Sequence, residues 1–211
     1  MKIINNRKGF TLIELLVVIA IIAILAVVVV LTLNPAQLLA QSRDSNRVSD
    51  FATLKSAISL YQVDVSSTNM GTAGTIVLAY AGTNTNVPAL TVFQSSTTAA
   101  GWGYNSADAT ATSSATSRAV NGTGWIPINF GAISSGAPFG SLPIDPLGTG
   151  QNANCVGGSP CMYTYLTNGT QYKIAAKMES TKYQNGGSGD VETGDGGNST
   201  STYEAGTNVN L

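Results

Sequence analysis

One carboxylate, Glu14, lies near the start of a long apolar segment of this chain. Of the 24 residues in the range 10–33, only three are polar: Thr11, Glu14 and Thr32. A charge is costly inside a bilayer or an apolar helix bundle, so an acidic residue in such a segment indicates a function. The chemistry open to it is charge pairing, because a carboxylate in apolar surroundings can neutralise an amine and fix how neighbouring chains align.

The segment 10–33 is long enough to span a membrane. At about 1.5 Å per residue its 24 residues would reach about 36 Å as a helix, and a hydrocarbon core is about 30 Å thick. The basic residues Lys2, Arg7 and Lys8 precede it and predict an N-terminus that stays in the cytoplasm. A secretory signal peptide has a shorter apolar stretch followed by a small-residue cleavage site, and no Ala-x-Ala follows this segment before the polar region. A plain membrane anchor fits the length but leaves Glu14 unexplained.

Residues 8–16, Lys-Gly-Phe-Thr-Leu-Ile-Glu-Leu-Leu, resemble the processing site of the type IV pilin superfamily. That family includes the type IV pilins and the pseudopilins of type II secretion. Its members are cut after the glycine by a prepilin peptidase and are then N-methylated. The resemblance implies loss of a leader, cleavage between Gly9 and Phe10, and methylation of Phe10. It also implies an assembly ATPase and a platform protein as separate chains.

After that cleavage, Glu14 would lie one helical turn from the positive amine of Phe10. The N-terminal end of the helix dipole also favours an anion at this position. Glu14 can pair with the amine of its own chain, or with the amine of a neighbouring chain in a packed array. We favour the second pairing, because the resemblance implies a filament and buried charges can set register. The prediction is an assembly register set by Glu14 and Phe10.

Composition argues against enzymatic and nucleic-acid-binding functions. The formal net charge is −1, and removing the three leader cations leaves −4, with no basic stretch elsewhere. We therefore expect no direct nucleic-acid binding by the bare subunit. The chain has no histidine, which removes the usual general base, the usual partner of a serine or cysteine nucleophile and the commonest zinc ligand. Neither a phosphate-binding nor a dinucleotide-binding glycine motif is present.

A helix break is expected where the apolar segment ends, at Asn34 and Pro35. Proline lacks the amide hydrogen that a continuing helix needs and crowds the preceding turn. Two outcomes are open at this point. Asn34 can cap a new helix that has Pro35 at its first position, or one long helix can kink here.

An amphipathic helix is predicted over the range 34–64. Apolar residues recur at spacings of three and four along it: Val48, Phe51, Leu54, Ile58 and Tyr61. Charged residues that can form mixed-sign pairs occupy the other positions: Arg43, Asp44, Arg47, Asp50 and Lys55. The stretch 43–64 also resembles the stem of major pseudopilins, which tends to close with a Leu-x-x-Tyr-x-x-Asp-like ending, here Leu60, Tyr61 and Asp64.

Strands are predicted after residue 64. Two short β-rich runs, 75–80 and 89–93, are separated by turn residues. The strongest signal is a hairpin formed by 162–166 and 171–178, because Asn168-Gly169 lies between them. These runs predict an antiparallel sheet.

The remaining part of the head is expected to be irregular. Residues 94–124 are rich in Ser, Thr, Ala and Gly and predict a long surface loop. Residues 125–130 predict an edge or irregular strand, since Pro127 cannot donate to a sheet. The Leu-Pro-x-Asp-Pro stretch at 142–146 resembles the pseudopilin-type head, in which it joins the sheet to the loops.

The only two cysteines, Cys155 and Cys161, flank a loop that contains glycine and serine. If the head lies outside the cytoplasm, an intrachain disulfide between them is expected. Two cysteines without histidine make a poor zinc site.

Three carboxylates in the glycine-rich tail, Asp190, Glu192 and Asp195, can supply oxygen ligands to calcium. Some pseudopilins bind calcium in a C-terminal loop of this kind. The spacing here is not that of an EF-hand, and it matches no known pilin site residue by residue. A solvated loop is the alternative. No other cofactor is expected.

Together these signals predict an α+β fold, with a long N-terminal helix packed on a C-terminal antiparallel sheet. The expected parts are a leader (1–9), a transmembrane or filament-core helix (10–33), an amphipathic helix (34–64) and a head (65–211). The predicted function is a structural, self-associating subunit of a type IV pilus-like filament, made in the inner membrane and displayed at the cell surface. The alternatives are a major pseudopilin of a type II secretion-like system and a membrane-anchored surface adhesin.

Overall fold

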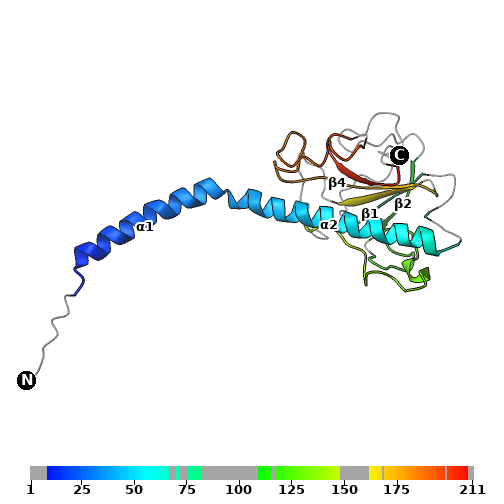
Figure 1. Cartoon of the computed structure of the whole chain (residues 1–211), viewed down its shortest axis with the longest axis horizontal. Coiled ribbons are helices and arrows are strands. Elements are labelled where there is room, and N and C mark those ends of the chain that lie inside the picture. Colours follow the sequence, from blue (N-terminus) through cyan, green and yellow to red (C-terminus); the bar gives the residue numbers. More distant parts are fainter. Residues whose placement is uncertain are drawn as a thin grey trace, which may run out of the picture. The chain divides into compact units, whose positions relative to one another are not determined.

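The computed structural model describes residues 9–66, 70–71, 76–81, 109–115, 117–147, 162–167, 169–197 and 199–208. The chain divides into two compact units, Met1–Leu39 and Ala40–Leu211. Figure 1 shows the helices and strands and labels α1, α2, β1, β2 and β4.

The first unit contains α1 (Leu12–Leu33) and the start of α2 (Pro35–Asp64). Asn34 separates the two helices and has left-handed backbone angles, with φ of 40° and ψ of 73°. Its carbonyl oxygen accepts a hydrogen bond from the backbone nitrogen of Gln37 at 2.9 Å. Pro35 takes the first position of α2, where its missing N–H does no harm. The interruption is therefore the start of a new helix, the first of the two alternatives.

From Ala40 onward α2 belongs to the second unit and buries one face. The buried residues recur at spacings of three and four: Ala40, Asp44, Arg47, Phe51, Leu54, Ala57, Ile58 and Tyr61. The predicted stripe is correct except for Val48, which is only half buried. The prediction that Asp44 and Arg47 lie away from the buried face is wrong. The two side chains form an ion pair with each other, and a paired charge can be buried.

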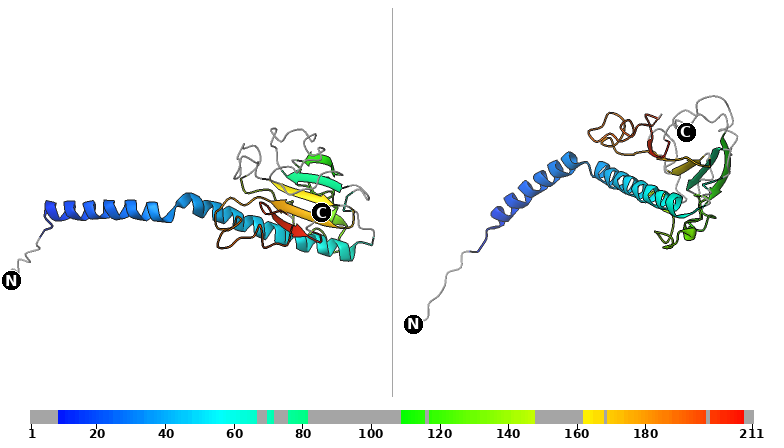
Figure 2. Two further views of the ribbon diagram at one scale, coloured as in Figure 1. Left: turned by 90° about the horizontal axis from the view of Figure 1, so that it is seen from above. Right: turned by 45° about the vertical axis from the view of Figure 1, so that its right-hand side comes forward.

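The described residues of the second unit form a five-stranded sheet in the order β2-β1-β3-β4-β5. Its strands are β1 (Ile76–Ala81), β2 (Ala109–Ala115), β3 (Tyr163–Thr167), β4 (Tyr172–Ala176) and β5 (Tyr203–Gly206). Strands β1, β3, β4 and β5 pair antiparallel in turn, whereas β2 pairs parallel to β1. The predicted α+β class is confirmed, with one parallel pairing at an edge of the sheet. Figure 2 shows α2 running along one face of this sheet.

The predicted hairpin is confirmed, since β3 and β4 pair antiparallel and Gly169 follows β3 with a φ of 94°. The predicted loop 94–124 is wrong in part, because it contains β2. The sequence of β2, Ala-Thr-Ala-Thr-Ser-Ser-Ala, carries only small and polar side chains and so gives a weak hydrophobic signal. The predicted strand 89–93 lies outside the described residues.

Residues 125–130 do not join the sheet. Asn129 forms an isolated bridge to Asn121, and a short 3-10 helix, η3 (Phe130–Ala132), follows. The segment instead contributes buried side chains to the core: Trp125, Ile126, Ile128 and Phe130. Its apolar residues were a sign of burial rather than of strand pairing.

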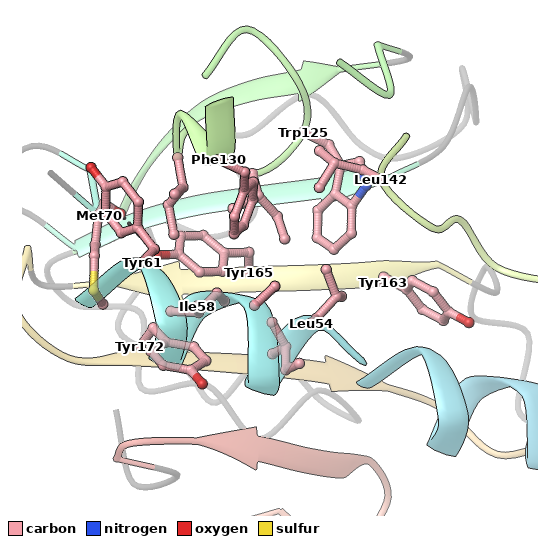
Figure 3. Close-up of a cluster of buried hydrophobic side chains, with 14 of the residues drawn as sticks. Leu54, Ile58, Tyr61, Met70, Trp125, Phe130, Leu142, Tyr163, Tyr165 and Tyr172 are labelled. Atoms are coloured by element: carbon pink, nitrogen blue, oxygen red, sulfur yellow. Dashed lines mark hydrogen bonds between the residues drawn. The ribbon is translucent and has the colours of Figure 1, made fainter. Parts of the chain in front are cut away.

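The core of the second unit lies between α2, the sheet and this irregular segment, as Figure 3 shows. Leu54 and Ile58 of α2 are fully buried there beside strand tyrosines. Two of the large side chains form hydrogen bonds there: the Trp125 indole donates to the carbonyl oxygen of Pro143 at 2.9 Å, and the Tyr165 hydroxyl donates to that of Met70 at 2.9 Å. Buried aromatic residues of this kind contribute much of the apolar burial that holds such a unit together.

Candidate functional site

The carboxylate of Glu14 closes a capping box at the start of α1. Its Oε2 accepts hydrogen bonds from the backbone nitrogen of Thr11 at 2.8 Å and from the Thr11 hydroxyl at 2.7 Å. The same hydroxyl oxygen accepts from the backbone nitrogen of Glu14 at 3.3 Å. N–H groups that a helix start leaves without helical partners are satisfied in this way. Both bonds to the carboxylate use Oε2, so among the described residues Oε1 is left for a charge from outside the helix.

The predicted cleavage junction lies just before this helix. Gly9 and Phe10 precede the N-cap Thr11, and both are exposed, Phe10 to 85%. A Cβ atom added to Gly9 would meet no atom within 4 Å. Packing within the described chain therefore does not require glycine at this position. The peptide bond between Gly9 and Phe10 is in non-helical, accessible backbone, which is the kind that proteases cut.

Among the described residues, helix α1 presents apolar side chains that are exposed. Ile19 and Leu25 are 57% and 58% exposed, respectively. Within the part of the chain that the structure describes, one helix is long and apolar enough to cross a membrane, over Leu12–Val30, with a mean hydropathy of 3.4. A continuous apolar surface of this length indicates contact with lipid or with other protein chains.

The second unit contains a buried ionic cluster, which we call the Arg47 cluster: Asp44, Arg47, Asp145 and Glu179. The guanidinium of Arg47 binds Asp145 with two parallel hydrogen bonds, Nε to Oδ2 at 2.7 Å and Nη2 to Oδ1 at 2.8 Å. Its Nη1 lies 2.7 Å from Asp44 Oδ1, and its Nη2 also contacts Glu179. Arg47 and Asp44 are fully buried. The cluster ties α2 to the segment before residue 147 and to the segment after β4.

A second arginine adds a second positive charge beside the three carboxylates of the Arg47 cluster. Arg43 donates to Glu179 with Nη2 at 2.7 Å from Oε2. Burial alone would raise the pKa of Glu179, but the hydrogen bonds and charges of Arg43 and Arg47 outweigh it and lower that pKa. Burial would lower the pKa of Arg47, yet Asp145 and Glu179 raise it overall. These groups hold fixed charges in ion pairs, so the cluster is suited to holding segments together.

The three carboxylates of the predicted calcium site each brace the loop after β4. Asp190 accepts hydrogen bonds from the backbone nitrogens of Gly186, Glu192 and Thr193. Glu192 accepts from those of Met178 and Asn185, and Asp195 from those of Gly197 and Glu204. Among the residues described, no group of three or more His, Cys, Asp or Glu is placed to hold a metal ion. The structure thus gives these side chains a local bracing role, and calcium binding stays a prediction.

The predicted disulfide partners, Cys155 and Cys161, lie outside the described residues, so that bridge also stays a prediction. Sequence reasoning missed the capping role of Thr11, although Thr-x-x-Glu is a recognisable capping sequence. It also missed the pairing of Arg47 with Asp145, which are 98 positions apart. No local pattern connects residues at that separation.

An uncovered apolar helix, with a capped start and an accessible junction before it, fits a membrane-anchored precursor that assembles into a surface filament. The chain carries the prokaryotic N-terminal methylation motif, which matches residues 4–30. This motif is the prepilin-type signal of type IV pilins and pseudopilins, and it implies processing by prepilin peptidase and assembly into a filament. No curated protein and no solved structure matches the chain significantly.

Proposed function

We propose that this chain is the structural subunit of a type IV pilus-like helical filament. The observation that carries the proposal is the apolar surface of α1, which is exposed among the described residues and follows a prepilin-type junction. In a filament, the α1 helices of many copies would bury this surface against one another, which the hydrophobic effect favours. Repeated head-to-tail contacts that do not close into a ring generate an open helix.

Glu14 sets the register between neighbouring copies in this proposal. Its Oε2 is already bonded to Thr11, and Oε1 is left for the amine that cleavage creates on Phe10 of an adjacent subunit. Each charge alone is costly in an apolar bundle, and together they neutralise each other. Cleavage after Gly9 therefore produces the cation that assembly needs.

The proposal assigns the chain to the inner membrane before assembly, with its N-terminus in the cytoplasm, and to the cell surface afterwards. Prepilin peptidase, an assembly ATPase and a platform protein are the separate chains that such a pathway requires. The open space around Gly9 supports selection of glycine by the peptidase, because packing against the described residues does not demand it.

A major pseudopilin of a type II secretion-like system is the second candidate, because the same N-terminal motif occurs in both classes. Electron microscopy of material sheared from the cell surface, with N-terminal sequencing of that material, separates the two. Fibres built of a chain that begins at methylated Phe10 support the pilus. Absence of external fibres, with a secretion defect in the deletion strain, supports the pseudopilus. A mature chain that begins at Met1, or an unassembled surface adhesin, would overturn both candidates.

The register role is tested with Glu14→Gln, which removes the charge and keeps an oxygen that can accept from Thr11. We expect surface filaments to decrease at least about tenfold, since a tenfold change corresponds to about 1.4 kcal/mol and an unpaired buried amine costs more than that. Thr11→Ala is the matched control, because it removes the side-chain half of the capping box and leaves the Glu14 charge. We expect it to keep most of its filaments. Equal filament yields in Glu14→Gln and wild type would rule out the register role.

A further inference from the structure

A lysine and a glutamate are buried together on the last two strands of the sheet. Lys173 lies on β4 and Glu204 on β5, and the two strands pair so that Lys173 is opposite Gly206 and Glu204 is opposite Ala175. The two side chains are thus diagonal neighbours on one face of the sheet. Lys173 Nζ lies 3.0 Å from Glu204 Oε1, and both side chains are 0% exposed.

This pair lies on the face of the sheet that α2 does not cover. Tyr172 and Ile174 alternate with Lys173 along β4 and belong to the core beneath α2. Successive residues of a strand point to opposite faces, so Lys173 points away from that core. Its cross-strand neighbour on β3 is Leu166, which is 2% exposed, so one side of the pair is aliphatic.

The backbone holds the two groups close. Gly206, opposite Lys173, has no side chain, and a Cβ atom there would lie 2.9 Å from the Lys173 Cα. The lysine therefore has room to lean across the strand pair toward Glu204. Glu204 Oε2 accepts a hydrogen bond from the backbone nitrogen of Ser199 at 3.1 Å, which fixes the orientation of the carboxyl group.

We propose that Lys173 and Glu204 condense to form an intramolecular isopeptide bond that joins β4 to β5. The Nζ–Cδ bond forms and one Cδ–O bond of the carboxyl group breaks. The ammonium and the carboxylate together supply the atoms of one water molecule, which leaves, so no oxidant, reductant or cofactor is consumed. The product is a neutral amide in place of two buried charges, and it removes the desolvation penalty that a buried ion pair carries.

A second carboxyl group adjoins the pair and can move the protons of this reaction. Asp195 accepts a hydrogen bond from the backbone nitrogen of Glu204, and a Cβ atom added to Gly197 would contact carboxylate oxygens of both residues. Burial raises the pKa of Asp195 and of Glu204, which favours the protonated acid that amine attack requires. Asp195 would accept the proton that Nζ loses and return it to the departing hydroxyl, as a general acid–base group does.

The position of the bond gives it a mechanical role. Strand β5 is four residues long and lies at an edge of the sheet, so among the described strands it pairs with β4 alone. A short strand with a single neighbour separates more easily from a sheet than a central strand does. A covalent link to β4 would hold β5 in place under force along a filament.

Mass spectrometry of the full chain, purified in its processed form, tests the proposal. In the wild type we expect an intact mass that is lower by one water molecule. Trypsin should then release one branched peptide in which 119–177, uncut after Lys173, is joined to 183–211. Separate linear peptides and an unreduced mass would show a plain ion pair and would overturn the proposal, as would a water loss that maps elsewhere.

Three variants sharpen the assignment. Lys173→Arg keeps the positive charge and abolishes the nucleophilic amine, so the mass deficit should disappear. Lys177→Arg is the matched control on the same segment, and it should keep the deficit in full. Asp195→Asn should lower the cross-linked fraction at least several-fold, and an undiminished fraction would overturn the role of Asp195. If Lys173→Arg does not fold, the branched peptide of the wild type still decides the question. None of these outcomes tests filament assembly, which is measured by electron microscopy of sheared surface material.

Discussion

Helices α1 and α2 contain similar apolar residues in opposite surroundings. Leu25 of α1 is 58% exposed, whereas Leu54 of α2 is fully buried. The apolar side chains of α2 find partners in the sheet and the loops of their own unit, while those of α1 find none among the described residues. The difference teaches that α2 is completed by the folding of its own unit, whereas the exposed apolar surface of α1 indicates contact with lipid or with other protein chains.

The charged groups of the two regions differ in the same way. Glu14 bonds to a residue three positions away, so its environment is set within one helical turn. Arg47 bonds to Asp145, 98 positions away, so its environment exists only when the unit has folded. A charge that is satisfied locally can serve assembly, whereas one that is satisfied at long range serves the fold.

The largest effect is expected from Arg47→Met, which keeps much of the side-chain volume and removes the charge. Asp44 and Asp145 would then be buried without their main partner, and the free energy of unfolding should fall by about 3–5 kcal/mol. Denaturant unfolding of the full chain in detergent, followed by tryptophan fluorescence, measures this, because Trp125 lies in the core.

Arg43→Met is the matched control for that change. The Arg43 side chain is 29% exposed, so its pair with Glu179 is partly screened by water. We expect a loss of about 1 kcal/mol or less. Equal losses in the two variants would contradict the central role given to Arg47.

The next largest effect separates the two helices directly. Leu54→Ala should lower the free energy of unfolding of the second unit by about 2–5 kcal/mol, through lost burial and a residual cavity. Leu25→Ala makes the same chemical change in α1 and should alter that free energy by less than about 0.5 kcal/mol. The same fluorescence experiment compares them. A large loss of head stability in Leu25→Ala would show that α1 also depends on packing within the chain.

The smallest effect is a dependence of stability on pH. Arginine partners lower the pKa of Glu179 in the folded state, so its stabilising contribution is present above the unfolded pKa and is lost as the pH falls below about 4. Burial raises the pKa of Asp50, despite the hydrogen bond from Tyr163, so its cost at neutral pH is relieved on mild acidification. Stability should therefore rise slightly below neutral pH and then fall.

Two variants separate the contributions to that profile, both measured by denaturant midpoints across a pH series. Asp50→Asn should make the rise smaller and keep the fall, because burial also raises the pKa of Glu192 and Asp195. Arg43→Met should move the fall to higher pH, because Glu179 loses one of its cations. A profile that is unchanged in Asp50→Asn would show that another carboxyl group causes the rise.

The N-terminal features could be predicted from sequence because each is encoded within a few neighbouring residues. The apolar segment and the junction between Gly9 and Phe10 are contiguous patterns, and so is the interruption at Asn34. The β3–β4 hairpin was predictable for the same reason, since Asn-Gly between two β-rich runs is a local signal.

Features that depend on contacts between residues far apart in the sequence could not be predicted from local patterns. Strand β2 has small and polar residues and becomes a strand only because β1 offers it a backbone partner. Residues 125–130 looked like a strand because they are apolar, yet their burial comes from packing beneath α2.

By itself, then, the sequence determined that the chain carries a prepilin-type signal, which segment forms the long apolar helix, and where the sheet turns back on itself. These depend on the hydrophobic pattern and on turn chemistry, which act over a few residues. Only the tertiary structure decided that Arg47 is buried among three carboxylates and that Lys173 meets Glu204. Such pairs depend on the order of the strands in the sheet and on the path of the loops that connect them. The free energy of a buried charge is set by the residues that the fold brings beside it.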